Sequence, residues 1–194
     1  DNTTTLATDL TGLDGKTSVA VDASAVTAIS GSSAEVAAAY AANTALTISG
    51  LGNETVSITG ADATVANVAA INTATTGLVT VSEVDVTGAT FSLAGLGDLT
   101  GITGLAKIDA SGTGVTAMTI TAAELFAAND GVGAIELIIN AGAADTLTLA
   151  GWAKGLKAQS GYDLYSTTGS FDGVAGDETY TVKVTADTSV LGAI

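Results

Sequence analysis

The chain has 194 residues, of which 20 are Asp or Glu and five are basic, all of them Lys, so its formal net charge is −15. It therefore lacks the clustered cations that nucleic acids and anionic membranes attract, and no apolar run reaches the roughly 18 residues of a membrane span. We expect neither nucleic-acid binding nor membrane insertion, and we expect divalent cations, Ca²⁺ in particular, as partners.

A phrase recurs along the chain. It reads ISGSSAEVAAAYAAN from Ile29, ITGADATVANVAAIN from Ile58 and ITAAELFAAND from Ile120. The first two copies are offset by about 29 residues, a spacing typical of repeat architectures. Each copy is typical of a strand end, a helix start and a short Ala-rich helix. The interval after Ile58 spans about two periods, and the segment from Phe91 occupies the second of them with a Gly-rich centre that predicts less helix.

Each copy also carries a helix start signal. Ser32 with Glu35, and Thr121 with Glu124, match the capping box, and Asp62 serves as a simple N-cap in the middle copy. The spacing predicts helices over about 32–42, 62–74 and 121–129. A hydroxyl paired with a base for catalysis is the alternative interpretation of these residues, and capping is favoured.

Stretches of alternating apolar and polar residues lie between and after these helices: TVSIT, LVTVSEVDV, AMTIT, ELIIN and TLTLAGW. They predict strands separated by Gly-containing turns. A unit of about 29 residues cannot bury its apolar face alone, so neighbouring units stack. We predict a mainly β fold with short helices, a solenoid-like stack of strand–helix–strand units, with β-sandwich domains as the alternative.

The composition changes after Trp152, where three of the four Tyr and three of the five Lys are found. This part lacks the helix phrase and contains an alternating strand, TYTVKV. The sequence predicts a repeat-containing β-rich domain over 1–152, followed over 153–194 by a terminal β cap or a small second domain. A stack of repeats needs such an atypical end to protect its last edge.

Two long phrases resemble the repeat regions of large secreted bacterial proteins, the RTX-type adhesins and surface-layer proteins. They are LTGITGLAKIDASGTGVTAMTITAAEL and GADATVANVAAINTATTGLVTVS, and the resemblance covers roughly residues 19–152. It implies an extracellular protein at a bacterial cell surface that acts as a Ca²⁺-dependent structural or adhesive surface.

The mark of that family is a Ca²⁺-binding nonapeptide, and its nearest match here is 173–181, GVAGDETYT. The match keeps two glycines and the apolar Tyr180, but has Val174 and Glu178 where the family has Gly and Asp. The resemblance implies Ca²⁺ ligands at Asp172, Asp177 and Glu178. A simple Gly-Asp turn before a strand is the alternative.

Acids on turns between units are further candidates for Ca²⁺ because carboxylates at close interfaces repel unless a cation bridges them. We expect Asp145 to be a Ca²⁺ ligand. Asp98 and Asp109 are further acids at which a cation would bridge two units.

Catalysis has few candidate residues. The chain has no His or Cys for a triad, a dyad or a zinc site, so we expect no enzyme. A glycosidase that uses two carboxylates is the remaining enzymatic alternative, but one Trp and four Tyr offer few aromatic side chains against which a sugar could stack.

We predict an extracellular building block of a surface layer, filament or adhesin stalk that associates with copies of itself. The alternative is an ice- or glycan-binding module that uses a flat Thr-rich strand face, with a surface glycan as partner. The Thr spacing in TLTL, TVSIT and AMTIT fits it, although Thr also suits the solvent face of any strand.

Overall fold

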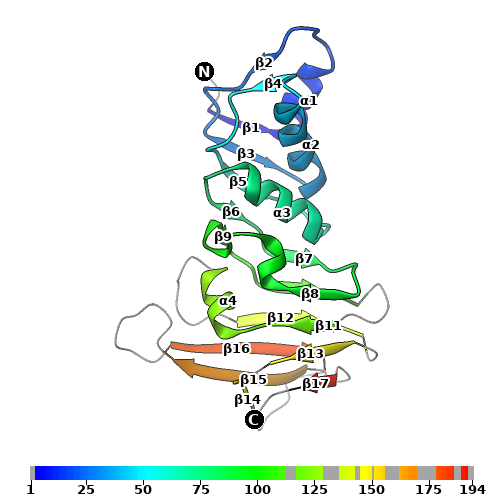
Figure 1. Ribbon diagram of the computed structural model, residues 1–194, viewed down its shortest axis with the longest axis vertical. Coiled ribbons are helices and arrows are strands. Elements are labelled where there is room, and N and C mark those ends of the chain that lie inside the picture. The colour runs from blue at the N-terminus through cyan, green and yellow to red at the C-terminus, as the bar shows by residue number, and fades with distance from the viewer. Residues whose placement is uncertain are drawn as a thin grey trace.

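The computed structural model describes residues 3–111, 117–128, 136–142, 145–149, 151–155, 162–169, 178–185 and 189–191. Within these ranges the chain forms seventeen strands, four α-helices and two 3₁₀-helices. The molecule is elongated, and its elements follow one another along the long axis largely in chain order (Figure 1). The fold is mixed α/β with more residues in strands than in helices, so the prediction of a mainly β chain with short helices is confirmed in outline.

The N-terminal half contains a parallel sheet and a small companion. Sheet A consists of β1 (Thr4–Leu6), β3 (Ala28–Gly31), β5 (Thr55–Ile58), β6 (Val79–Thr80) and β9 (Ile102–Thr103), in that order. Sheet B consists of β2 (Val21–Asp22) and β4 (Ile48–Ser49), also parallel. These parallel pairs do not match the antiparallel sheets of a β-sandwich.

The C-terminal half contains two further sheets. Sheet C pairs β7 (Glu83–Asp85), β10 (Lys107–Asp109), β12 (Glu136–Asn140) and β16 (Glu178–Thr185) in parallel, then β15 (Tyr162–Gly169) and β14 (Ala153–Lys154) antiparallel. Sheet D pairs β8 (Thr90–Ser92), β11 (Ala117–Thr119), β13 (Thr146–Thr148) and β17 (Ser189–Leu191) in parallel. Strands β16 and β17 thus extend sheets that begin before Trp152, and a boundary at residue 152 stays a prediction.

The register of sheet A corrects the predicted alignment. Its central paired residues are Thr5, Ile29, Val56, Val79 and Ile102, so each interval is shorter than the predicted period and the intervals are unequal. Ile29 pairs with Val56, whereas Ile58 lies opposite Gly31, because the segments that carry the helices differ in length. Parallel pairing in sheet A therefore recurs at unequal intervals along the chain.

Helices α1 (Ala7–Asp14), α2 (Ser33–Thr44) and α3 (Val65–Ala74) lie in a row beside sheet A (Figure 1). The 3₁₀-helices η1 (Leu93–Leu96) and η2 (Leu99–Gly101) follow in the chain, and α4 (Ala122–Ala127) lies further along the molecule, where it contacts both of them. The three predicted helices and the weakly helical segment after Phe91 are confirmed. Helix α1 was not predicted, because Leu6 offers it no side-chain cap and Gly12 within it has a low helix propensity.

The capping predictions are confirmed at two of three helices. Ser32 with Glu35 and Thr121 with Glu124 both form complete capping boxes. The N-cap of α3 is Thr64, whose hydroxyl accepts a hydrogen bond from the N–H of Asn67 at 3.3 Å. The assignment of Asp62 as that cap is wrong, because the helix begins three residues further on.

The core is a set of inward-facing apolar columns, one for each ladder of parallel strands. In sheet A the buried column is Ile29, Val56, Val79 and Ile102. In sheet C it is Val84, Ile108, Ile139 and Val184, and in sheet D it includes Phe91, Met118 and Leu147. The parallel register stacks these apolar side chains directly on one another, and each fully buried one contributes about 1.5–3 kcal/mol of transfer free energy. Among the described residues, no helix combines the length and apolar character that crossing a bilayer requires.

Candidate functional site

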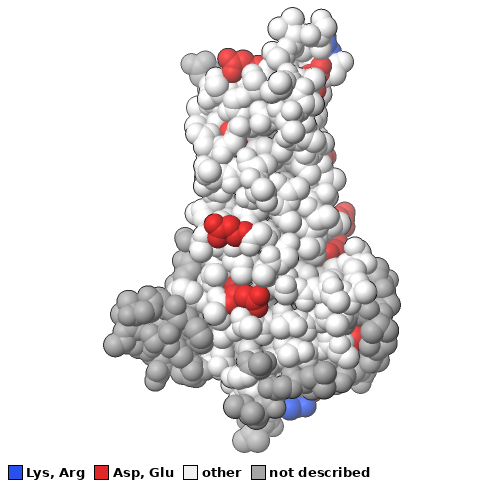
Figure 2. Space-filling model, viewed as in Figure 1, with Lys and Arg blue, Asp and Glu red and all other residues white. Residues whose placement is uncertain are grey.

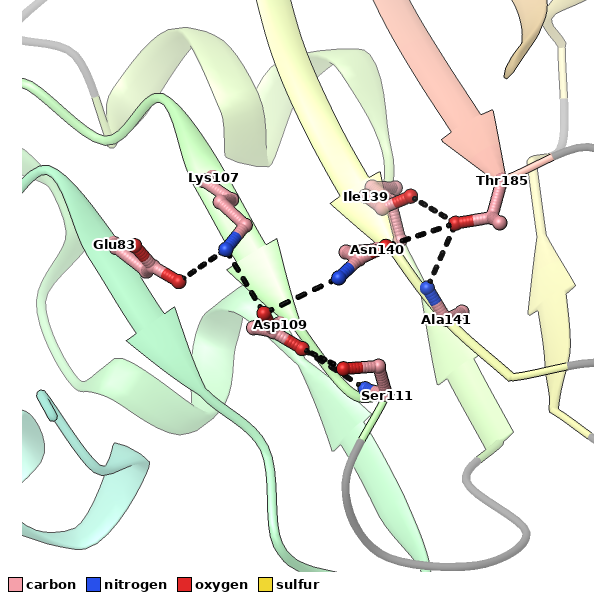
Figure 3. A network of polar contacts seen from close by, with 8 residues as sticks. All are labelled: Glu83, Lys107, Asp109, Ser111, Ile139, Asn140, Ala141 and Thr185. Carbon is pink, nitrogen blue, oxygen red and sulfur yellow. Dashed lines mark hydrogen bonds and ion pairs between the residues drawn. The ribbon is translucent and has the colours of Figure 1, made fainter. Parts of the chain in front are cut away.

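A polar ladder crosses the outer face of sheet C (Figure 3). Parallel pairing places Asp85, Asp109 and Asn140 side by side, and the pairing of Ile139 with Val184 sets Thr185 next in the same row. Four strands that are distant in sequence thus present polar side chains to one another. Hydrogen bonds and ion pairs connect side chains of this row and its neighbours into the largest such group that the structure describes, which includes Glu83, Lys107, Asp109, Asn140 and Thr185.

Lys107 and Asp109 form the centre of the ladder. The Nζ of Lys107 lies 2.8 Å from Oδ2 of Asp109 and also binds the carboxylate of Glu83. Hydrogen bonds with Asp109 and Glu83 raise the pKa of Lys107 above its ordinary value. Burial opposes ionisation of Asp109, but hydrogen bonds from Lys107 and Ser111 outweigh it and hold the pKa of Asp109 well below its usual range. Both groups are therefore stabilised in their charged forms.

The ladder continues through an amide and a hydroxyl. The Nδ2 of Asn140 donates to Oδ2 of Asp109 at 3.3 Å. The Oγ1 of Thr185 accepts from the N–H of Ala141 at 3.0 Å and lies 3.2 Å from the carbonyl oxygen of Ile139. These contacts connect β10, β12 and β16, so the network joins successive layers of the sheet.

The pKa of Asp85 is shifted in the opposite direction to that of Asp109. Burial is the main cause that raises its pKa, and the charges of Glu83, Asp109 and Asp62 add to that effect, while Lys107 opposes it. This end of the ladder therefore favours either a proton or a cation. In the part of the chain that the structure describes, however, no three carboxylates are grouped as a metal site requires.

Of the four predicted Ca²⁺ ligands, only Asp145 is among the residues whose side chains the structure describes. Asp145 is buried, and its Oδ2 accepts a hydrogen bond from the N–H of Gly142 at 2.7 Å. Asp172 and Asp177 lie outside the described residues, and Glu178 begins β16 with a side chain that is also outside them. The calcium site thus stays a prediction.

Of the two other acids predicted on turns, Asp98 has a local role, whereas Asp109 ends strand β10, so its placement on a turn is wrong. The Oδ1 of Asp98 accepts hydrogen bonds from the N–H and the hydroxyl of Thr100, at 3.1 and 2.8 Å, and so caps η2. Asp109 belongs to the polar ladder on β10.

The roles of Glu83, Lys107, Asn140 and Thr185 were not predicted, although the sequence carries a signal for the ladder. An apolar–Asx–apolar phrase recurs as VDA, VDV, IDA and INA, centred on Asp22, Asp85, Asp109 and Asn140. Two copies extend to Asp-Ala-Ser, and in each the Asp Oδ1 accepts the Ser N–H at 3.0 Å: Asp22 from Ser24, and Asp109 from Ser111. The phrase indicates a strand followed by an Asx-turn.

A second buried polar group lies between α2 and β5. Glu54 is fully buried, and its carboxylate accepts hydrogen bonds from the hydroxyl of Tyr40 at 3.0 Å and from the N–H of Gly52 at 2.9 Å. Burial is the main cause that raises the pKa of Tyr40, so its hydroxyl stays protonated as the donor. The sequence offered no signal for this pair.

The outer faces of sheets A and D differ from that of sheet C. Pairing aligns hydroxyl residues in columns, which are Ser30, Ser57, Thr80 and Thr103 in sheet A and Ser92, Thr119 and Thr148 in sheet D. All seven are exposed or half-buried, and none of them is charged. On the face seen in Figure 2, Asp and Glu likewise lie in small separate groups within uncharged surface.

Comparison with known proteins adds no family. No family model matches the chain, and neither a curated protein nor a solved structure matches it significantly.

Proposed function

We propose that this protein is an extracellular structural module, a β-rich solenoid that serves as a building block of a surface layer, filament or adhesin stalk. The observation that carries the proposal is the strand pairing. Each successive turn of the chain adds one strand to a parallel sheet. In sheet A, the strands that pair in this way carry Ile29, Val56, Val79 and Ile102. Such an arrangement builds a rod whose length grows with each repeat.

The side chains support a role in rigidity. Inward columns of Ile and Val bury a continuous core along the long axis, and the polar ladder through Asp109 and Asn140 bonds successive layers on the outside. Hydrogen-bonded ladders in a partly buried setting fix the register of the strands. A stiff and regularly stacked rod suits a stalk or a lattice better than it suits a flexible binding domain.

The resemblance of 19–152 to RTX-type adhesins and surface-layer proteins supports placement at a bacterial cell surface. The net charge of −15 supports dependence on Ca²⁺, since close packing of such surfaces needs bridging cations. The segment around Asp172, Asp177 and Glu178 is our first candidate for binding the ion, and Asp145 is the second.

Electron microscopy and sedimentation test this proposal directly. Purified protein is compared in chelator, in millimolar Ca²⁺ and in millimolar Mg²⁺. We expect rods in every condition, and lateral or lengthwise assembly with an increase in melting temperature in Ca²⁺ alone. Compact particles in chelator contradict the rod. Identical behaviour in the two cations contradicts the dependence on Ca²⁺.

The hydroxyl columns favour a second candidate, an ice- or glycan-binding face. Neighbouring strands lie about 4.7–4.9 Å apart, so Ser57 and Thr80 belong to a regular array of hydroxyl groups. The test is inhibition of ice recrystallisation, together with binding to a glycan array. Activity that is lost in Ser57→Lys/Thr80→Lys but kept in Thr8→Lys, an exposed change on α1, would establish this function instead.

A further inference from the structure

A small polar cavity lies where α3 ends beside η2. Its volume is about 290 Å³, and its walls are the last turn of α3, the turn that leads into β6, and η2 with the residue before it. Its lining includes Asn72, Thr75, Thr76, Leu78, Asp98 and Thr100. These residues lie well inside the sequence and are all described, so neither end of the chain contributes to the cavity.

A buried amide in this cavity has an acceptor without a donor. Asn72 is 7% exposed, and its Nδ2 donates to the carbonyl oxygens of Leu96 at 3.0 Å and Asp98 at 2.8 Å, which fixes the orientation of the amide. Its Oδ1 accepts no hydrogen bond from the part of the chain that the structure describes. Gly101 keeps the space beside this oxygen open, because a Cβ there would lie 2.6 Å from it. A buried acceptor that lacks a donor is unfavourable, so a ligand that supplies one is stabilised here.

The side-chain donors of the cavity are already engaged. The hydroxyls of Thr75, Thr76 and Thr100 all donate within the chain, at 2.7, 3.4 and 2.8 Å. The carboxylate of Asp98 is exposed, and its Oδ1 accepts from Thr100, whereas its Oδ2 accepts from none of the described residues. The side chains of the cavity thus offer two available acceptors, Asn72 Oδ1 and Asp98 Oδ2, and no available donor. The ligand that matches them brings its own N–H or O–H donors.

The electrostatics of the cavity favour a positively charged ligand. Helix α3 ends at the cavity, and its last turn contains no basic residue, so the negative end of the helix dipole is not compensated. Asp98 adds a full negative charge, and none of the lining residues is a lysine. Leu78, which is 39% exposed, forms an apolar wall. An apolar wall beside charged acceptors suits a cation that carries a hydrocarbon chain better than it suits a hydrated metal ion.

We propose that this cavity binds an alkylammonium group. The ammonium donates to Oδ2 of Asp98 and Oδ1 of Asn72, and the hydrocarbon chain packs against Leu78. An ammonium group has three N–H donors and no acceptor, which is the complement of the available groups in the cavity. A lysine side chain of a peptide and a free aliphatic diamine share this chemistry. The site goes beyond the proposed structural role and does not depend on it, because every residue that forms the cavity belongs to one chain.

An NMR titration tests the site through the backbone amide resonances of Thr100 and Gly101. The probes are Nα-acetyl-lysine N-methylamide, 1,5-diaminopentane and, as an uncharged analogue of the first, Nα-acetyl-norleucine N-methylamide. In chelator and at low salt, both amines should shift these resonances saturably and the norleucine compound should not. Added salt should weaken the binding of the amines. Tighter binding of the lysine compound assigns the site to a peptide side chain, and tighter binding of the diamine assigns it to a free amine.

Two substitutions and a matched control test the residues. Asp98→Asn keeps an oxygen that can accept from the N–H of Thr100 but removes the charge, and it should weaken amine binding by at least about tenfold. Asp22→Asn is the control, because Asp22 accepts from the N–H of Ser24 at 3.0 Å in a turn of the same kind outside the cavity. It makes the same change of charge and should leave binding unchanged. Leu78→Ser should weaken binding by about threefold or more, because it removes the apolar wall.

Four outcomes overturn the site. They are the absence of saturable shifts with either amine, equal binding of the norleucine compound, full binding by Asp98→Asn, and shifts of the same resonances by Ca²⁺ at lower concentrations than by the amines. The last of these would make the cavity a metal site. None of them concerns the shape of the rod, which electron microscopy tests separately.

Discussion

The hydroxyl of Tyr40 donates a hydrogen bond to the carboxylate of Glu54 at 3.0 Å, and both side chains are almost entirely shielded from water. The bond joins α2 to the segment that leads into β5. The carboxylate is held by neutral donors, the Tyr40 hydroxyl and the N–H of Gly52.

Removal of the hydroxyl should be costly. We expect Tyr40→Phe to reduce the free energy of unfolding by about 1–3 kcal/mol, since it takes a donor from a buried carboxylate. Chemical denaturation of Tyr40→Phe, Glu54→Gln and the double variant gives a mutant cycle. Strictly additive effects of the two substitutions contradict a direct interaction.

In the polar ladder on sheet C, replacing Asp109 and replacing Asp85 should change the free energy of unfolding in opposite directions. The pKa of Asp109 is lowered in the folded protein, so its charge stabilises the fold above the unfolded pKa of about 4. That contribution is lost as the pH falls towards the folded value. We expect Asp109→Asn to lower the free energy of unfolding by about 1–2 kcal/mol at neutral pH, after allowance for partial exposure, and to have little effect in strong acid.

Asp85 should behave in the opposite sense, because its pKa is raised. Its contribution is favourable below the unfolded pKa and is lost as the pH rises through the folded value. Asp85→Asn should therefore stabilise the protein at neutral pH, by less than about 1 kcal/mol. Thermal melts from pH 3 to about pH 8 compare the two variants. Destabilisation of Asp85→Asn at neutral pH is the result that contradicts the electrostatic account.

The close approach of two chain segments at Gly77 predicts a strong effect of a single methyl group. A Cβ at this position would lie 2.2 Å from the carbonyl oxygen of Glu54, which is backbone and cannot rotate away. We expect Gly77→Ala to destabilise by about 2–5 kcal/mol, as overpacking at a rigid contact does. Gly12→Ala is the matched control, since its Cβ meets nothing within 4 Å inside α1. This control should stabilise by about 0.5–1 kcal/mol in the same denaturant titration.

The start of α3 can be located by mutation. Thr64→Ala removes the side chain that accepts from the N–H of Asn67 and should lower the free energy of unfolding by about 0.5–2 kcal/mol. Asp62→Ala leaves that bond intact and should change stability by less than about 0.5 kcal/mol. Equal losses of stability in Thr64→Ala and Asp62→Ala would show that Asp62 contributes to the N-cap of α3. Ser32→Ala and Thr121→Ala should each cost about as much as Thr64→Ala, because both break observed capping boxes.

Local chemistry explains what the sequence predicted well. Ser32 and Thr121 bond to backbone groups three residues away, and such contacts depend only on the order of residues. Strands such as Glu136–Asn140 follow from alternation, because one face must be apolar to be buried. The error at α3 has a local cause as well, since Asp62 and Thr64 both suit an N-cap and only the packing of the helix selects between them.

The sequence by itself determined strands such as Thr55–Ile58 and Glu136–Asn140, the capped helices and the excess of acidic residues, because alternation, capping and charge are properties of neighbouring residues. It did not show that the predicted strand LVTVSEVDV divides into β6 of sheet A and β7 of sheet C. Only the tertiary structure decided that Ile29 pairs with Val56, that Lys107 lies between Glu83 and Asp109, and that Tyr40 reaches Glu54. Each of these depends on how segments of unequal length stack against one another. A shift of one residue in a strand turns every side chain to the other face, so the register is set by the packed core as a whole.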